Sequence, residues 1–379
     1  MTDMTRMPPD AIEITDGERD FYVPQFEVFM SGRSMPKDII RDVTQVTYKD
    51  SIKELDSFEI TINNWDADTR TYKYSDHGGA YNFDPGQKLV VKMGYFGRQA
   101  LTQMIEGEIT QLRPAFPASG APTLQISGLN ILHRLRKKQN TESYTKTNEL
   151  KIASTIAKRL NLDFKGKESE AAMLELPYVL QDNQFDIIFL MERARRISYD
   201  IFVEEDPPRK SILHFEPSDS VQRRRYDLKY GKSLIQFTPT LTTKDQVNKV
   251  TVKGWDAVHK KPISETITRA ELRTRGMSKK DEQFIESAFD REEVITDRPV
   301  RTKAEAEREA RAAFDRIVKD MITGSGSTVG LPDLRAGSIV YIRGVGQRFS
   351  GRYFVTSTTH SINDSGYTTQ FEARREEVE

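Results

Sequence analysis

The segment VTSTTHSINDSGYTT at residues 355–369 has a counterpart earlier in the chain, ITQLRPAFPASGAPT at residues 109–123. In both, a pair of β-branched residues is followed ten residues later by Ser-Gly and then by a predicted strand. Each segment also comes after a strand led by a glycine, Gly86 to Gly94 in one case and Gly337 to Gly344 in the other. Two explanations stay open: Ser-Gly turns recur by chance in β proteins, or a barrel is duplicated, with one copy at each end of the chain.

The region around the first segment is predicted to be rich in strands. Phe58, Ile60 and Ile62 point to one side of the segment 57–63 and its polar residues to the other, which is the period of a half-buried strand. Similar patterns predict strands at 22–31, 43–48, 88–94, 104–112 and 123–127. Many short strands separated by turns are typical of a barrel or a closed sandwich.

The middle of the chain has a different character. Thr147 or Asn148 can cap a helix whose apolar residues share one face. A second helix is predicted at 186–198, and the segments 200–204 and 211–215 are typical of a hairpin around Pro207-Pro208. This pattern predicts an α+β segment at about 135–228.

Strands return towards the C-terminus, at 233–238, 248–255, 338–343, 353–361 and 367–373. A charged stretch at 269–297 is predicted to be helical around 279–289. Thr302 and Glu305 fit a capping box for a helix that extends to Met321. We expect that helix to stop at Thr323–Ser327, a Gly/Ser run that is typical of a flexible breaker.

Composition excludes several classes of protein. The 379 residues carry 57 Lys plus Arg and 57 Asp plus Glu, a balance that disfavours a general nucleic-acid binder. No apolar run approaches the length of a transmembrane helix, and the polar residues 1–20 lack the apolar core of a signal peptide. There is no cysteine, which excludes disulfides, thiolate metal sites and cysteine nucleophiles and fits synthesis in a reducing cytoplasm.

No catalytic, metal or cofactor motif is found in the sequence. The five histidines, His77, His133, His214, His259 and His360, are too far apart for a short-range metal pair. The glycines of 346–353 have phosphate-loop spacing, but Arg-Tyr follows them and the chain enters a strand. Asp66 and Asp68 begin like a calcium loop, which Arg70 and Thr71 interrupt. The basic clusters 133–138 and 223–225 are typical of solvated edges or salt bridges between subunits. We therefore predict a protein that is not an enzyme and has no cofactor.

Six segments in this order resemble the late control protein D family of contractile phages. They are 55–64 (LDSFEITINN), 181–186 (QDNQFD), 250–256 (VTVKGWD), the alanine-rich helix at 304–321, 330–342 (GLPDLRAGSIVYI) and 351–371, which begins GRYFV and ends GYTTQF. The family-motif residues within or near these segments are Gly86, Gly254, Trp255, Gly330, Pro332, Gly337, Gly351, Tyr353, His360 and Gly366. The likeness extends from about residue 20 to 375. The order of the six segments is more specific than any single motif among them.

The resemblance implies a baseplate hub, similar to the head region of type VI secretion spike proteins. It implies a mainly β protein of the α+β class, with two tube-protein-like β-barrel domains flanking a central α+β domain. The expected boundaries are a polar leader at 1–19, a first barrel domain at 20–134, the central domain at 135–230 and a second barrel domain at 231–379, with a charged helical insertion at about 269–321.

The same resemblance implies a homotrimer whose pseudo-sixfold ring joins a hexameric inner tube protein to a trimeric spike, beside other baseplate proteins. The chain ends at Glu379 without an OB-fold or β-helix, so we expect the spike to be a separate polypeptide. We expect no specific nucleic-acid partner and no direct membrane insertion. Synthesis in the bacterial cytoplasm and a place in an assembled tail or injection particle follow from this expectation. The alternatives are a tail-associated cell-wall hydrolase, which a turbidity assay would reveal, and a standalone β-rich adhesin.

Overall fold

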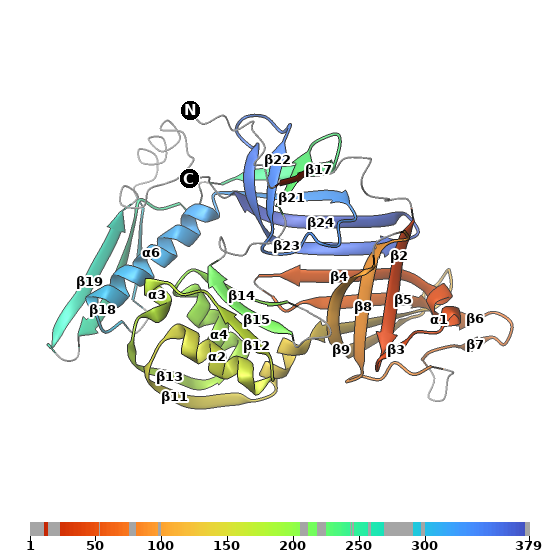
Figure 1. The fold of residues 1–379 in the computed structure, drawn as a ribbon, viewed down its shortest axis with the longest axis horizontal. Helices are drawn as coiled ribbons and strands as arrows, with labels where there is room; N and C mark the ends of the chain where they lie inside the picture. The colour runs from red at the N-terminus through yellow and green to blue at the C-terminus, as the bar shows by residue number, and fades with distance from the viewer. Residues whose placement is uncertain are drawn as a thin grey trace.

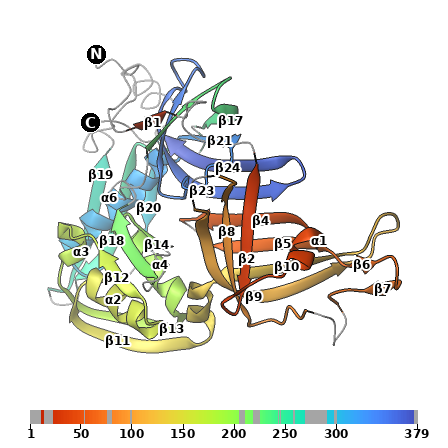
Figure 2. The same cartoon turned by 45° about the vertical axis from the view of Figure 1, so that its right-hand side comes forward.

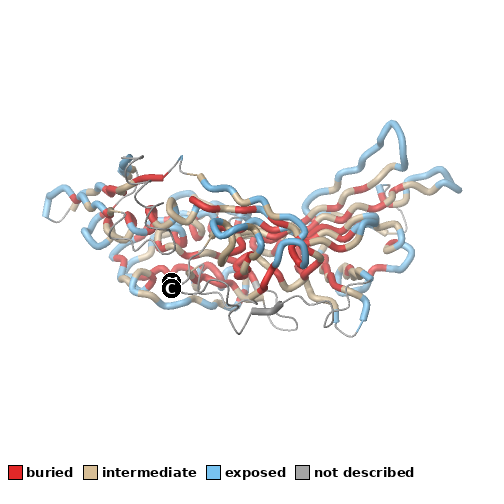
Figure 3. Tube along the Cα trace, turned by 90° about the horizontal axis from the view of Figure 1, so that it is seen from above, coloured by how far each residue is buried: buried red, intermediate tan, exposed pale blue. Residues whose placement is uncertain are grey.

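The computed structural model describes residues 11–13, 23–52, 54–75, 81–97, 100–204, 211–217, 225–242, 244, 246–256, 259–268, 291–296 and 300–375. Strands dominate it and form several sheets, which confirms the prediction of a mainly β protein of the α+β class (Figure 1). Among the described residues, no helix is both long and apolar enough to cross a membrane. Buried residues run along the strands, and exposed segments gather in projecting loops (Figure 3).

The first β region is one continuous antiparallel array. Its strands are hydrogen-bonded in the order β4 (Val43–Ser51), β5 (Ser57–Asn63), β10 (Thr123–Asn130), β9 (Thr102–Ala115), β8 (Lys88–Tyr95) and β2 (Pro24–Met30). The alternation predicted for β5 is confirmed, since Phe58, Ile60 and Ile62 are buried in the core of this region. Short elements complete it: β3 (Arg33–Ser34), α1 (Lys37–Asp42), β6 (Trp65–Asp66) and β7 (Thr71–Tyr72).

The second β region has the same strand order. It runs β17 (Leu234–Leu241), β21 (Ile322–Val329), β24 (Gly366–Arg375), β23 (Gly351–Asn363), β22 (Ile339–Arg343) and β16 (Arg225–Lys229). In each region the strands follow one another along the chain in the same sequence. One difference is that β16 runs parallel to β22, whereas β2 runs antiparallel to β8. β1 (Ala11–Glu13), within the segment expected to be a polar leader, pairs with β16.

Irregular positions recur at the same places in the two regions. An extra residue bulges from β9 at Thr110 and from β23 at Thr356, as the register shifts of both ladders show. Each threonine hydroxyl donates to a carbonyl of the neighbouring strand: Thr110 to Ser127 at 3.4 Å, and Thr356 to Glu372 at 3.2 Å. Bulges are conserved structural devices more often than accidents. Their equivalent positions favour duplication over chance recurrence.

The glycine turns also match. Gly86 and Gly337 have φ angles of +91° and +86°, in the left-handed region that favours glycine. Each glycine N–H donates to the carbonyl of Ile109 or Val355, at 2.7 and 2.8 Å. The N–H of that residue donates back to the carbonyl after the glycine, at 2.9 Å in both regions. The paired segments of the sequence therefore occupy equivalent turns.

The two β regions share one sheet because β23 is long. Its first residues pair with β22, and Ser357–Asn363 pair with Gln45–Ser51 of β4 in the first region. We call this β23–β4 contact the cis junction. β23 and β4 lie side by side in both Figure 1 and Figure 2.

The central unit packs beside both β regions (Figure 1). Its elements are η1 (Ile131–Arg136), β11 (Gln139–Thr147), α2 (Glu149–Arg159), β12 (Asp163–Gly166), α3 (Glu170–Met173), β13 (Leu176–Phe185), α4 (Asp186–Arg195), β14 (Tyr199–Glu204) and β15 (Ile212–Pro217). Asn148, one of the two predicted caps, accepts a hydrogen bond from the Lys151 N–H at 2.9 Å. The predicted hairpin is confirmed as the antiparallel pair β14–β15. The second helix ends three residues earlier than predicted, at Arg195.

A separate unit is inserted between β17 and β21. It contains β18 (Lys249–Asp256), β19 (Lys261–Thr268), β20 (Glu292–Ile295) and α6 (Lys303–Lys319), with its own core around Val250 and Phe314. The Thr302–Glu305 capping box is confirmed. At the base of the insertion, the Thr242 N–H donates to the Met321 carbonyl at 2.9 Å. The helix predicted around 279–289 lies outside the described residues.

The prediction of a flexible breaker at Thr323–Ser327 is wrong, because these residues belong to β21. Two aromatic rings occupy the space above its glycines. A Cβ on Gly324 would lie 2.5 Å from the ring of Phe237, and one on Gly326 would lie 2.5 Å from the ring of Phe371. The glycines therefore admit aromatic side chains from the neighbouring strands, which compensates for the low strand propensity of glycine.

Candidate functional site

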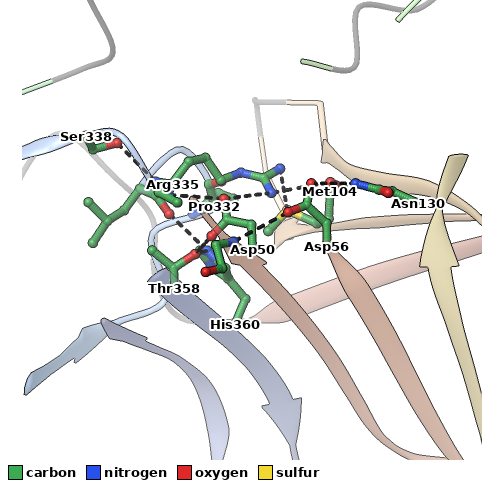
Figure 4. A network of polar contacts seen from close by, with 12 residues as sticks. Asp50, Asp56, Met104, Asn130, Pro332, Arg335, Ser338, Thr358 and His360 are labelled. Atoms are coloured by element: carbon green, nitrogen blue, oxygen red, sulfur yellow. Dashed lines mark hydrogen bonds and ion pairs between the residues drawn. The ribbon is translucent and has the colours of Figure 1, made fainter. Parts of the chain in front are cut away.

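Polar side chains at the cis junction form a hydrogen-bonded network that joins the two β regions (Figure 4). Asp50 and Thr358 face each other in the β4–β23 ladder, and His360 faces Tyr48 two residues further on. Arg335 enters from the loop between β21 and β22. Because these residues come from both regions, the network adds side-chain contacts to the β23–β4 ladder that holds the regions together.

Arg335 extends its guanidinium into the first β region. Its Nη2 donates to the Gln103 carbonyl at 3.0 Å and its Nη1 to the Met104 carbonyl at 3.3 Å. The guanidinium also lies 4.6 Å from the ring centroid of Tyr48, which is a cation–π contact. Burial acts to lower the pKa of Arg335, but Tyr48 and Asp50 outweigh it and hold the pKa above its ordinary value. Arg335 is therefore a permanent, largely buried cation.

Two aspartates lie near this cation. Asp50 accepts hydrogen bonds from the Ala336 N–H at 3.1 Å and from the Thr358 hydroxyl, and it lies 4.0 Å from Arg335 Nη1. Asp56 accepts from Asn130 Nδ2 at 3.2 Å. Burial, and then the charge of Asp50, raise the pKa of Asp56 to about 7. Below that pH, Asp56 is therefore mostly protonated and adds no negative charge beside the guanidinium of Arg335.

His360 is fully buried between the loop and the ladder. Its Nε2 lies 2.9 Å from the Leu334 carbonyl, and its Nδ1 lies 3.0 Å from the Tyr367 hydroxyl and 3.1 Å from the Thr369 hydroxyl. Burial, together with the nearby Arg335, lowers its pKa well below the ordinary value. The neutral ring fits these partners if Nε2–H donates to Leu334 and Nδ1 accepts from a hydroxyl. The contacts occupy both ring nitrogens.

The other family-motif residues occupy turns and close contacts. Gly351 and Gly366 have φ angles of +152° and +117°. A Cβ on Gly330 would lie 2.1 Å from the ring of Tyr367, and one on Gly254 would lie 2.5 Å from the Val300 carbonyl. These glycines therefore allow a tight turn or a close approach.

The three remaining motif residues differ in burial. Tyr353 is fully buried, and its hydroxyl donates to the Phe349 carbonyl at 2.7 Å. Pro332 accepts from Arg335 Nε at 3.1 Å through its carbonyl, which places it at the edge of the junction network. Trp255 is exposed on the inserted unit, away from the junction. The structure thus brings Pro332 and His360 together with Arg335 and distributes the other motif residues elsewhere.

Other histidines have carboxylate partners at separate places. The imidazoles of His133, His214 and His259 lie 3.0, 2.8 and 2.7 Å from a glutamate or aspartate oxygen. His77 lies outside the described residues. Within the described part of the chain, no group of three or more His, Asp or Glu side chains is arranged to hold a metal ion.

Sequence reasoning did not identify Asp50, Asp56 or Arg335. Arg335 lies inside a quoted motif, but 285 positions separate it from Asp50, and no local pattern links the two. Their association depends on the β23–β4 pairing. Only a strand-pairing signal between 45–51 and 357–363 could have revealed it.

Comparisons with known proteins match nearly the whole chain. Residues 21–364 match the family described as the Alg8 N-terminal domain. No curated protein matches the sequence. Among solved structures, the chain is similar to the 43 kDa tail protein of prophage MuSo2 from Shewanella oneidensis, with a TM-score of 0.69 at 14% identity over 93% of this chain and 98% of that one.

Two further solved structures are similar to the chain. The tail protein from Neisseria meningitidis MC58 has a TM-score of 0.69 at 12% identity over 94% of this chain and 97% of that one. The Escherichia coli c3393 protein is described as a type VI secretion component similar to the T4 bacteriophage tail proteins gp27 and gp5. Its TM-score is 0.56 at 12% identity over 91% of this chain and 76% of that one. At these identities, the comparisons establish a shared fold.

Proposed function

Because the chain belongs to the Alg8 N-terminal domain family and has the fold of phage tail proteins, we propose that it is a structural baseplate hub of a contractile phage tail or a phage-like injection system. In this role it is a homotrimeric adaptor that joins a hexameric inner tube to a trimeric spike, beside other baseplate proteins. It is synthesised in the bacterial cytoplasm and becomes part of the assembled particle, with no specific nucleic-acid partner and no membrane insertion.

The internal repeat is the observation that carries this proposal. Two regions of one chain have the same strand order, the same bulges and the same glycine turns. A sixfold tube can bind a threefold ring if every chain offers two similar surfaces. This favours two barrel domains around a central domain, as in the expected division at 20–134, 135–230 and 231–379, except that β16 places the first strand of the second barrel at Arg225–Lys229. The charged insertion then lies on the outside of the ring, where its charges stay hydrated.

The site chemistry favours a structural role over hydrolysis. At the junction, the ring nitrogens of His360 are occupied by protein groups, and Arg335 contacts main-chain carbonyls. General acid–base catalysis needs a titratable group that can reach a substrate. The motif residues accordingly act as turn and packing residues in this proposal.

Mass in solution, followed by class-averaged images, tests the hub. We expect a trimer that appears as a three-lobed ring with a central hole. A protein that stays monomeric at high concentration, even when mixed with tube and spike proteins, would refute the proposal. A turbidity assay on purified cell wall separates the hub from a hydrolase. If the protein clears the cell-wall suspension and a single histidine-to-alanine substitution abolishes this clearing, the result favours the enzyme.

A further inference from the structure

The cis junction predicts a second junction, because the repeat supplies equivalents for both of its strands. β9 after its bulge at Thr110 corresponds to β23 after its bulge at Thr356, so Gln111–Ala115 are equivalent to Ser357–Ser361. Only the β23 segment has a described strand on its outer edge, which is β4. The equivalent edge of β9 is exposed and pairs with no described strand.

β17 supplies the other half. It corresponds to β4, since the ladders β4–β5 and β17–β21 both shift register one residue after their first pair, at Thr44 and Ile235. Phe237–Leu241 are therefore equivalent to Val46–Asp50. β4 uses its outer edge to bind β23, whereas the outer edge of β17 pairs with no described strand. One chain thus presents two complementary edges that it does not join itself.

Apolar side chains mark both edges. Phe116, just beyond β9, is 59% exposed, and Ile235 and Leu241 of β17 are 57% and 39% exposed. At the cis junction, the equivalents of Phe116 and Phe237 are Ile362 and Val46, which face each other and contribute to the core of the first region. Exposed apolar residues beside an open strand edge mark an interaction surface. The same arrangement at the two open edges fits a second copy of this chain.

We propose that β9 of one copy pairs antiparallel with β17 of the next in the register of the cis junction, so that Arg113 lies opposite Thr240 and Phe116 opposite Phe237. This seam rests on the proposed function, because it is the contact that closes the ring. At the cis junction, Lys49 and Thr359 are the pair equivalent to Thr240 and Arg113.

Prolines make the seam different from the cis junction. In the β23–β4 ladder, the Ile52 N–H donates to the Thr356 carbonyl at 3.0 Å. Every second pair of opposite residues counted from there, including Tyr48 with His360, is therefore positioned to exchange main-chain hydrogen bonds. The equivalent residues at the seam are Pro239 and Pro114, which have no N–H. Two main-chain hydrogen bonds at the centre of the seam are therefore missing. Edge prolines also hinder indiscriminate strand pairing before assembly.

Disulfide trapping tests the register, and the absence of native cysteines makes every crosslink attributable. Arg113→Cys with Thr240→Cys is the seam pair. Cα atoms of residues opposite each other without main-chain hydrogen bonds lie about 4.5 Å apart, within the range of a disulfide. Lys49→Cys with Thr359→Cys is the matched control within one chain, and Arg113→Cys with Thr238→Cys is displaced by two residues.

We expect the seam pair to give covalent dimers and trimers under mild oxidation, the cis pair to give only crosslinked monomer, and the displaced pair to react poorly. Two results with a protein that is trimeric by mass would overturn the seam and leave the proposed hub intact. In the first, the displaced pair crosslinks better than the seam pair. In the second, neither of these pairs crosslinks although the cis pair does. A protein that forms no trimer would overturn both.

Discussion

Asp56 at the cis junction gives the protein a measurable dependence of stability on pH. Burial, and then the charge of Asp50, raise its pKa from 3.8 to about 7. Between these two values the folded chain holds a proton that the unfolded chain has released. The free energy of unfolding should therefore fall as the pH rises from about 4 to about 7, and level off above that range.

The size of this effect follows from the shift. One pKa unit corresponds to 1.36 kcal/mol, so the shift of Asp56 from 3.8 to about 7 sets an upper limit of about 4 kcal/mol. Asp56 is only partly shielded from solvent, so we expect about 2 kcal/mol. Asp56→Asn should remove this pH-dependent loss of stability. The two carboxyl oxygens of Asp56 accept from Asn130 Nδ2 at 3.2 Å and from the Ser51 N–H at 3.4 Å, whereas an asparagine has only one acceptor oxygen. The variant should thus be slightly less stable than the parent at pH 4.5 and more stable at pH 8.

Urea unfolding at fixed protein concentration, repeated from pH 4.5 to 8.5, measures the effect, because assembly makes stability depend on concentration. Asp38→Asn is the matched control: the Asp38 carboxylate is exposed on α1, and the substitution should leave the pH profile of the parent unchanged. If Asp56→Asn shows the same decline between pH 4 and 7 as the parent, the raised pKa is not the cause.

Three further substitutions test other features of the structure. Arg335→Met should destabilise the chain by about 3 kcal/mol in urea unfolding, since Asp50 loses its nearby cation and the carbonyls of Gln103, Met104 and Pro332 lose the guanidinium donors. Arg335→Lys should fall in between, and a loss below about 1 kcal/mol would contradict the network. Gly330→Ala should lower the free energy of unfolding by about 1–3 kcal/mol because its Cβ would collide with the Tyr367 ring; unchanged unfolding would show that the ring moves freely. Pro114→Thr combined with Pro239→Thr should slow dissociation of the proposed trimer roughly tenfold by restoring two donors, and faster subunit exchange between labelled trimers would count against the seam.

Local patterns predicted the local elements well. The capping box at Thr302 and Glu305 predicted the start of α6, and alternation predicted β5, because each depends on residues within a few positions. The paired segments led by Gly86 and Gly337 suggested the repeat, since a turn with positive φ leaves a recognisable glycine.

Long-range pairing could not be predicted in the same way. The breaker expected at Thr323–Ser327 failed because Phe237 and Phe371, from two other strands, cover its glycines. Glycine-rich sequence is ambiguous until its neighbours are known. The junction network was missed for a related reason: Asp50 and Arg335 resemble ordinary surface charges until β23 lies against β4.

The hydrogen bond from Thr242 to Met321 at the base of the inserted unit has a consequence for how this fold can change length. β17 and β21 are adjacent antiparallel strands, and their equivalents β4 and β5 are connected by residues 52–56 alone. A connection of that size would therefore suffice geometrically to replace residues 243–320, leaving the strand pairing of both β regions and the cis junction in place. The strands of both β regions are thus continuous without the inserted unit, which is joined to their chain at one turn.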